Sequence, residues 1–417
     1  MISARKKTKV HSVLLLTAML LVSSCVAENV PAPKVHGYRF IGTFTPLHPV
    51  PPLADYINAI SCPTESFCMG IASIPVGTPV PVGTPSNYRI YEVEWRPNSG
   101  WQIPYNGFIT TDDYPALWNT SSISCATPVS CFAAVHFLGS ENEILVWHTP
   151  GWSMSNKVDS NVIAISCPTA ETCFTLGYYG GSVKAAESGG SPTLSVWHPK
   201  SGMKIIGKPA ALRFPPGLIP FFSLSCPTTT WCMLVTSQYR ALSWHLGSGW
   251  SAPTTLPFES ALFLKVACAN DNFCMAIGIN HALSWTQDTG WSKPVAIAPG
   301  GSREVTNAWF DALSCPTVKF CFATDSIPSF TEVLCPPSHS ISSVLSCTDS
   351  EVPKFFSGAN GYALEWIKGK GWSLPKPILG GNSENGIPSS CPSDNFCMVA
   401  DGPQIMEYSG PTHLDTK

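Results

Sequence analysis

The sequence predicts an all-β fold, a seven-bladed β-propeller with four-stranded blades. Two repeated features of the 417-residue chain predict it: seven Cys-x5-Cys stretches, and six segments between them in which a tryptophan, a short turn and Gly-Trp or Gly-Met follow one another. The first cysteines of successive stretches lie 42 to 76 residues apart, which suits blades with loops of variable length. No stretch shows a sustained helical period, and 39 prolines and 32 glycines favour many turns.

Each cysteine stretch reads as the turn between the first two strands of a blade, strands A and B. Met or Phe follows every second cysteine, and Pro follows the first cysteine in five copies. The spacing matches neither structural zinc sites nor two-residue redox motifs, so we expect no metal site and no cofactor. We expect structural disulfides instead, pairing Cys62–Cys68, Cys125–Cys131, Cys167–Cys173, Cys226–Cys232, Cys268–Cys274, Cys315–Cys321 and Cys391–Cys397.

The tryptophan segments read as strand C, a turn and strand D. In the copy from Phe221 to Leu256, we expect strand A at 221–226, strand B at 231–237, strand C at 241–246 and strand D at 250–256. We expect the repeated tryptophans to fill the space between neighbouring sheets, with repeated ligand stacking as the alternative. The six segments are Tyr91–Trp101, Ile144–Trp152, Leu194–Met203, Ala241–Trp250, Ala282–Trp291 and Ala363–Trp372.

The two ends of the chain should close the ring. The last cysteine copy continues to Gly410 and stops where its strand D should begin, and the segment His36–Leu47 can supply that strand. Tyr38 precedes Cys62 by 24 residues, the spacing from Trp101 to Cys125, so we expect Tyr38 at the tryptophan position. Pairing the N-terminal strand with the last blade would leave no exposed sheet edge.

The N-terminus predicts export. Basic residues from Arg5 to Lys9 precede an apolar run, Val13–Val22, and "VSSC" at Val22–Cys25 matches the bacterial lipobox, so residues 1–25 are expected to be a lipoprotein signal with Cys25 lipidated. The alternative is an ordinary signal cleaved near Ala27. A linker at 26–35, the propeller at 36–410 and a tail at 411–417 would follow, exported and lipid-anchored to the cell envelope, or secreted.

The cysteine count supports this division. Of 17 cysteines, the seven pairs use 14, and Cys25 belongs to the lipobox. The remaining two lie in one insertion, so we expect a Cys335–Cys347 disulfide.

Composition narrows the expected partners. A net charge of −3 with a pI of about 6.4 gives no electrostatic footprint for nucleic acid. Apart from the N-terminal run, no apolar stretch approaches the roughly 20 residues of a membrane helix. We therefore expect a monomeric ring that meets the membrane only through its lipid and binds a protein or a glycan.

Loop lengths predict the binding face. The A–B and C–D turns are short, whereas the long insertions Pro75–Asn87, Tyr178–Pro192 and Asp325–Gly361 all fall between strands B and C, and the D–A connections also vary. Long loops on a rigid scaffold often carry binding sites, although tolerated surface decoration is the alternative. The ligand-face candidates are Asp112, Asp113, Tyr114, Tyr178, Tyr179, Arg303 and Glu304.

No catalytic residue can be assigned from the sequence. Trp-His recurs at Trp147–His148, Trp197–His198 and Trp244–His245, but strand C lies far from the axis, so these histidines should be too far apart to share a metal. No phosphate loop, nucleophile elbow or zinc-helix motif is present. A binding module is therefore expected. The alternatives are a secreted glycan-active hydrolase or lyase that uses carboxylates near the central funnel, and a scaffold in an envelope complex.

The repeat combination "SCPT" or "SCPS", three residues, Cys, and later "ALSW…GW" resembles repeats of secreted bacterial β-propeller proteins. The resemblance spans residues 36–410. It implies the propeller fold and export, but because that group shares no catalytic motif, it implies little about activity.

Overall fold

The computed structural model describes most of the propeller region. The described residues are 37–47, 56–76, 87–104, 114–115, 122–135, 143–148, 151–154, 160–179, 192–209, 212, 222–257, 265–278, 281–297, 309–326, 361–378, 386–402 and 404–410. Regular structure in these ranges consists of β-strands, and none of the described residues forms a helix long and apolar enough to span a membrane.

The first three sheets each contain four strands in chain order, and blade 1 carries a fifth short strand. Blade 1 has β2 (Tyr56–Thr64), β3 (Phe67–Val76), β4 (Asn87–Arg96) and β5 (Gly100–Gln102), with β6 (Tyr114–Pro115) also paired to β4. Blade 2 has β7 (Ser122–Thr127), β8 (Ser130–Val135), β9 (Glu143–His148) and β10 (Gly151–Met154). Blade 3 has β11 (Ser160–Thr169), β12 (Thr172–Tyr179), β13 (Thr193–His198) and β14 (Gly202–Gly207).

The next three sheets carry a fifth short strand beside strand C. Blade 4 has β15 (Phe222–Thr228), β16 (Trp231–Thr236), β17 (Arg240–His245), β18 (Gly249–Trp250) and β19 (Thr254–Thr255). Blade 5 has β20 (Lys265–Asn270), β21 (Phe273–Gly278), β22 (His281–Thr286), β23 (Gly290–Trp291) and β24 (Val295–Ala296). Blade 6 has β25 (Trp309–Thr317), β26 (Phe320–Ser326), β27 (Gly361–Ile367), β28 (Gly371–Trp372) and β29 (Lys376–Ile378).

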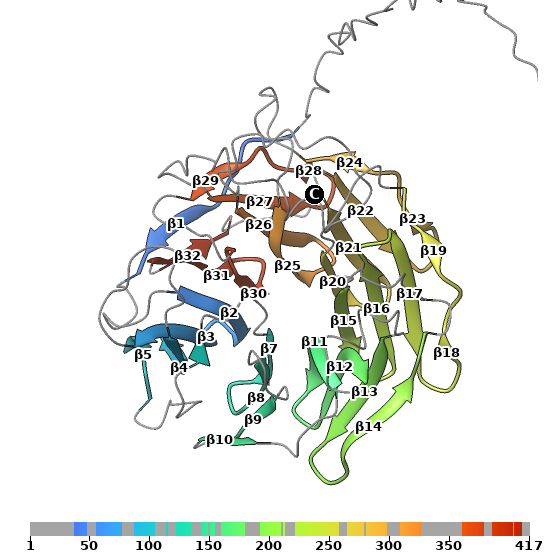
Figure 1. Ribbon diagram of the computed structural model, residues 1–417. Coiled ribbons are helices and arrows are strands. Elements are labelled where there is room, and N and C mark those ends of the chain that lie inside the picture. The colour runs from blue at the N-terminus through green and yellow to red at the C-terminus, as the bar shows by residue number, and fades with distance from the viewer. Residues whose placement is uncertain are drawn as a thin grey trace, which may run out of the picture. The chain divides into compact units, whose positions relative to one another are not determined.

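Blade 7 combines the two ends of the described chain. Its strands are β30 (Ser389–Ser393), β31 (Phe396–Asp401), β32 (Gln404–Ser409) and β1 (Thr43–Pro46), in that order across the sheet. Figure 1 shows the seven A strands around a common centre, with later strands of each blade farther out. Each A strand contacts the A strand of the next blade, and β30 contacts β2. The predicted seven-bladed β-propeller is therefore confirmed, including its closure by an N-terminal strand.

A disulfide closes the A–B hairpin of every blade. All seven predicted Cys-x5-Cys pairs form, each around a two-residue turn. Because each bond closes a short loop, the chain-entropy contribution is about 2 kcal/mol per disulfide. Strand A is longer than the sequence predicts: in blade 4 it continues through Thr228, so the turn itself is only Thr229–Thr230.

The serine before the first cysteine joins neighbouring blades. In six blades its Oγ accepts a hydrogen bond from the backbone N–H of the first cysteine of the next blade. The donor and acceptor pairs are Cys125–Ser61 (2.9 Å), Cys167–Ser124 (3.0 Å), Cys226–Ser166 (2.9 Å), Cys268–Ser225 (3.0 Å), Cys391–Ser314 (3.2 Å) and Cys62–Ser390 (2.9 Å). Blade 5 carries Ala267 at this position, so the boundary between blades 5 and 6 lacks the acceptor.

An aromatic pair also crosses every blade boundary. The aromatic residue of strand C packs against an aromatic side chain next to the second cysteine of the preceding blade. The pairs are Phe67–Trp147, Phe132–Trp197, Phe174–Trp244, Trp231–Trp285, Phe273–Trp366, Phe320–Tyr408 and Phe396–Trp95, with ring centroids 4.2 to 6.0 Å apart. Such pairs contribute about 0.5–1.5 kcal/mol beyond the area they bury. The expected space-filling role of the tryptophans is confirmed.

The Gly-Trp motif shapes the outer edge of each blade. Its glycine has a positive φ in five blades, at Gly100, Gly202, Gly249, Gly290 and Gly371, where a side chain would be strained. In blade 4, the next residue, Ser251, donates its N–H to the Ser243 carbonyl (2.8 Å), and its Oγ accepts from the Ser243 N–H (3.0 Å). Pro253 has no N–H to continue the ladder, so the single strand D expected at 250–256 is split into β18 and β19.

The closing strand differs in register from the prediction. Phe44, and not Tyr38, pairs with Tyr408, as each Gly-Trp tryptophan pairs with its strand-C tryptophan elsewhere. Tyr38 instead forms a parallel bridge with Ser373 of blade 6. The 24-residue spacing was misleading because the segment from Tyr38 to Ile41 passes beside blade 6 before it joins blade 7.

A buried carboxylate holds this closing segment in place. Glu365 of blade 6, which is 0% exposed, accepts hydrogen bonds from the Ile41 N–H (2.5 Å), the Gly42 N–H (3.4 Å) and the Tyr408 hydroxyl (2.6 Å). Burial, together with the Glu365 charge, raises the pKa of Tyr408 far above its ordinary range, so the phenol keeps the proton that it donates. A Cβ on Gly42 would lie 2.0 Å from the Tyr408 ring, which explains the glycine.

We expect the six serine–cysteine hydrogen bonds between blades, here called the serine seam, to contribute measurably to the free energy of unfolding. Ser61→Ala leaves the Cys125 N–H without its acceptor, which should cost about 1–2 kcal/mol. Ala267→Ser supplies the missing acceptor to Cys315 and should add about 0.5–1 kcal/mol. Thermal unfolding followed by circular dichroism should show a lower Tm for the first variant and a higher Tm for the second, with Ser99→Ala in an exposed turn as the unchanged control. Equal Tm values for all four proteins would contradict this role.

Candidate functional site

Most ligand-face candidates from the sequence lie outside the described residues. This applies to Asp112, Asp113, Arg303 and Glu304, and also to the expected lipid site Cys25 and the expected Cys335–Cys347 disulfide. Three tyrosines are placed by their backbone. Tyr114 lies in β6 opposite Tyr88, and Tyr178 and Tyr179 end β12 opposite Asn161 and Ser160. They belong to blades 1 and 3, at the strand ends from which D–A and B–C connections leave.

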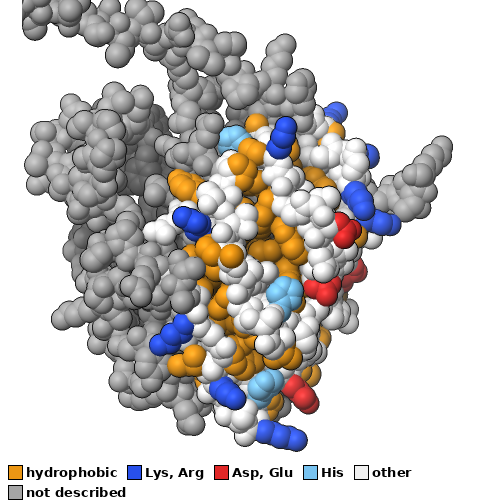
Figure 2. Space-filling view, turned by 90° about the vertical axis from the view of Figure 1, so that its right-hand side faces the viewer, with side chains coloured by type: hydrophobic (Ala, Val, Ile, Leu, Met, Phe, Trp, Pro, Cys, Tyr) orange, Lys and Arg blue, Asp and Glu red, His pale blue; other side chains and the backbone are white. Residues whose placement is uncertain are grey.

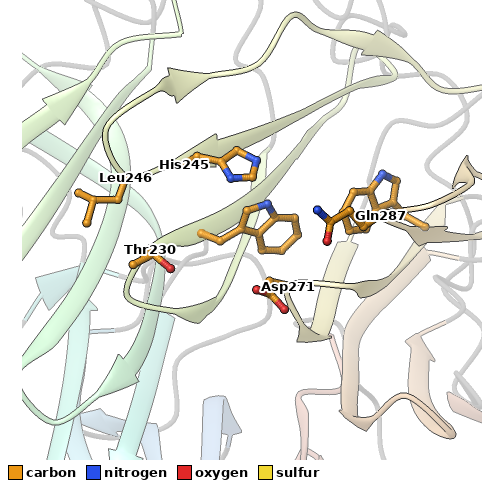
Figure 3. A pocket seen from close by; sticks show the side chains of 7 residues that line it. Thr230, His245, Leu246, Asp271 and Gln287 are labelled. Atoms are coloured by element: carbon orange, nitrogen blue, oxygen red, sulfur yellow. The ribbon is translucent and has the colours of Figure 1, made fainter.

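The described part of the chain contains a pocket that the sequence did not predict. It lies between blades 4 and 5, at the end of the blades that carries the A–B and C–D turns (Figure 3), and encloses about 320 Å³. Small-molecule sites start at about 300 Å³. Blade 4 contributes Trp231 and His245, and blade 5 contributes Asp271, Trp285 and Gln287.

Two stacked indoles form the floor of this pocket. Trp231 and Trp285 lie with centroids 5.3 Å apart and planes 25° apart. Trp231 is 3% exposed, whereas Trp285 is partly exposed. The His245 ring stands edge-on to Trp231 at 6.3 Å, and Leu246 beside it is 66% exposed. The floor is therefore an apolar aromatic surface that solvent reaches mainly at Trp285.

The rim of the pocket is held by backbone hydrogen bonds. In blade 4 the Leu246 N–H donates to the Thr230 carbonyl (2.9 Å), which ties the C–D turn to the A–B turn. In blade 5 the Gln287 N–H donates to the Asn272 Oδ1 (3.2 Å), which likewise ties the C–D turn to the A–B turn. The disulfides Cys226–Cys232 and Cys268–Cys274 close both A–B turns. A ligand would meet turns that are already ordered, which lowers the entropic cost of binding.

Polar groups surround the aromatic floor. Thr230, His245, Asp271 and Gln287 are at the pocket, and Figure 3 shows Asp271 and Gln287 on the blade 5 side. Together they offer a hydroxyl, an imidazole, a carboxylate and an amide, so the rim can both donate and accept hydrogen bonds. The pocket contains one carboxylate, whereas glycoside hydrolysis by the common mechanisms needs two. The arrangement suits binding.

A second hollow lies at the outer edge between blades 3 and 4. It encloses about 430 Å³ and is lined by Gly207, Pro209, Leu242, Trp250 and neighbouring residues. No carboxylate or histidine lines it, so it offers fewer polar partners than the pocket at Trp285.

Charged groups on the innermost strands were candidates for the enzyme alternative. Burial lowers the pKa of Lys265 on β20, and the Asp311 carboxylate on β25 opposes this shift. Asp311 Oδ2 also accepts a hydrogen bond from the Ile387 N–H at 2.9 Å. Asp311 thus has a structural role, tying blade 6 to the segment that enters blade 7. Among the described residues, no group of three or more His, Cys, Asp or Glu side chains could hold a metal.

Lys and Arg side chains are dispersed over the surface shown in Figure 2. They lie singly around the coloured part, and hydrophobic side chains form a band between them. A ligand bound on this side would therefore be recognised locally and not by a broad field of one sign.

Glu92 is a buried carboxylate whose acidity is strongly perturbed. It is 2% exposed on β4, and its Oε2 accepts a hydrogen bond from the Trp152 Nε1 of blade 2 (2.7 Å). Burial, reinforced by the Glu94 charge, raises the pKa of Glu92 from 4.5 to about 8. Glu92 is part of the contact between blades 1 and 2 and lines neither pocket.

Glu92 should make stability depend on pH. Between its unfolded pKa near 4.5 and its folded pKa near 8, the unfolded state loses the proton and the folded state keeps it, so stability falls as pH rises through this window. Glu92→Gln should remove this component and gain on the order of 3 kcal/mol relative to the parent between pH 5 and pH 8. Urea unfolding at both pH values measures the gain. Glu94→Gln should give a smaller change, and a gain for Glu92→Gln that does not grow with pH would refute the assignment.

Comparisons with known proteins agree on the fold. No family model and no curated protein matches the sequence. Among solved structures, the WD40 β-propeller domain of Doa1 is similar with a TM-score of 0.51 and 8% identity, over 88% of this chain and 98% of that one. YCF48 bound to D1 peptide is similar with a TM-score of 0.49 and 10% identity, over 90% of this chain and 98% of that one. The Aleuria aurantia lectin, a six-bladed propeller with a fucose recognition mode, is similar with a TM-score of 0.45 and 11% identity. The match covers 79% of this chain and 99% of that one. At 8% identity the likeness to the Doa1 domain is one of fold alone, and the chain is a β-propeller.

Proposed function

We propose that the chain is an exported binding module, a lipid-anchored propeller that holds a protein or glycan ligand on the face formed by its B–C and D–A connections. The observation that carries this proposal is the contrast between the two ends of the blades. At one end, every A–B turn has two residues and a disulfide. At the other end, the B–C connections differ from blade to blade, from residues 279–280 in blade 5 to residues 327–360 in blade 6.

The long connections leave the same ends of equivalent strands. Residues 77–86 and 327–360 join strands B and C in blades 1 and 6, and residues 298–308 join blades 5 and 6. Hydrogen bonds from the cysteine N–H groups to serines of the preceding blades align equivalent positions of neighbouring A strands. The connections therefore leave the strands on one face of the ring. Variable segments on a rigid scaffold commonly carry recognition. Asp112, Asp113, Tyr114, Tyr178, Tyr179, Arg303 and Glu304 remain the candidate contacts.

Export is supported by the disulfides and by the N-terminal pattern. Seven structural disulfides persist most readily in an oxidising compartment. In the proposal, residues 1–25 are the signal, Cys25 carries the lipid, 26–35 link it to the propeller, and 411–417 form a tail. Labelling cells with an alkynyl palmitate should mark the parent and not Cys25→Ala. Equal labelling of both would exclude this anchor.

The insertion in blade 6 allows a direct test of the binding face. Ser326 and Gly361 are partners across the β26–β27 ladder, so an Asn-Gly turn can replace residues 327–360 and keep the hairpin. The mature chain and the shortened variant would be screened against a glycan array and against solubilised envelope proteins. We expect the parent to bind a ligand and the variant to lose at least tenfold in affinity.

A second variant replaces residues 77–86 on the same face by an Asn-Gly turn, since Val76 and Asn87 are also ladder partners. Both variants should unfold at temperatures close to that of the parent, because the hairpins are kept. A parent that binds nothing, or loss of binding in neither variant, would exclude this face.

A further inference from the structure

At two blade boundaries, an acid of the A–B turn closes the gap to the preceding blade. Three blades carry an acid at the first position of this turn: Glu65 in blade 1, Asp271 in blade 5 and Asp394 in blade 7. Two of these acids accept a hydrogen bond from a hydroxyl of the preceding blade. Thr317 donates to both Asp394 oxygens (2.8 and 3.0 Å), and Ser393 donates to Glu65.

At the boundary between blades 4 and 5 this bridge is open. The hydroxyl in the equivalent place belongs to Thr228, which instead lies 3.3 Å from the Thr230 hydroxyl. Within the described part of the chain, the exposed Asp271 carboxylate has no hydrogen-bond partner. The pocket of about 320 Å³ occupies this boundary, and Asp271 lines it. The position that a donor hydroxyl fills at two other boundaries is therefore open to a ligand.

We propose that this pocket binds a neutral sugar ring. The ring would donate one hydroxyl to Asp271, as Ser393 and Thr317 do for the acids at the other boundaries. Its apolar C–H face would rest on the exposed part of Trp285, while Gln287 and His245 offer further donors and acceptors to the remaining hydroxyls. The ordered turns and stacked indoles supply a rigid platform, which a small, polar ligand needs for measurable affinity.

The exposed aromatic surface is too small to enclose a quaternary ammonium group. A quaternary ammonium group is best held by several exposed aromatic faces, but Trp231 is 3% exposed, and only Trp285 offers a face. The remaining lining groups, Thr230, His245 and Gln287, suit hydroxyls. This site lies on the opposite face from the proposed loop site and does not depend on it.

The experiment uses the mature full-length propeller and named probes. Methyl glycosides of glucose, galactose, mannose and N-acetylglucosamine are tested by saturation-transfer NMR and by tryptophan fluorescence, with choline as the cationic probe. At least one glycoside should bind with a Kd of about 1 mM, as expected for a ligand of this size. Asp271→Asn should weaken binding about tenfold, because it removes a charge-assisted hydrogen bond. Gln287→Ala should weaken it by a smaller factor.

The control variant is Asp288→Asn, which removes an equally exposed charge from the adjacent C–D turn without touching the pocket. It should bind like the parent. Replacing residues 327–360 should also leave glycoside binding unchanged, which separates this site from the loop face. The proposal is overturned if no glycoside binds, if only choline binds, or if Asp271→Asn binds as tightly as the parent while unfolding at the same temperature.

Discussion

The hydrogen bond from a cysteine backbone N–H to the serine of the preceding blade joins neighbouring blades at six of the seven boundaries. It links equivalent points on adjacent A strands. The disulfide of the same hairpin ties this cysteine of strand A to strand B, and its N–H donates to the serine of the preceding blade. One short motif, Ser-Cys-x5-Cys, thus fixes both the turn within a blade and the contact between blades.

Aromatic pairs accompany this hydrogen bond at six boundaries, as Phe67–Trp147 does between blades 1 and 2. Between blades 5 and 6, where Ala267 replaces the serine, the Phe273–Trp366 pair forms without it. Closure uses the same geometry with different residues: Tyr408 takes the place of the tryptophan, packs on Phe320, and is held by Glu365. Between blades 4 and 5, the aromatic pair has Trp231 where the other pairs have phenylalanine, and a pocket of about 320 Å³ lies at this boundary.

The sequence predicts the repeated features well, because each is encoded by local residues. Cysteine spacing gives the seven hairpins, and the closing strand follows from the missing segment of the last copy. Contacts between blades are harder to predict, since they join residues tens or hundreds of positions apart. The sequence shows a serine before the first cysteine in six blades. That these serines accept hydrogen bonds from cysteine N–H groups is apparent only when neighbouring blades are placed side by side.

The same limit explains the two main surprises. Spacing alone placed Tyr38 at the tryptophan position, because nothing local shows that the segment first binds Glu365 and Ser373 in blade 6. The sequence does not predict the pocket at Trp285, because its lining residues come from two different blades. The one local signal was Asp271, one of only three acids at that turn position.

Amide hydrogen exchange on protein labelled with ¹⁵N-cysteine tests the seam most directly. The first cysteines of six blades donate to a serine, whereas Cys315 faces Ala267. Ala267→Ser identifies the Cys315 signal, because it should slow the exchange of that amide alone. The account predicts that the Cys315 amide exchanges at least about tenfold faster than the other six, through local opening. Equal protection of all seven amides, or no slowing in Ala267→Ser, would contradict it.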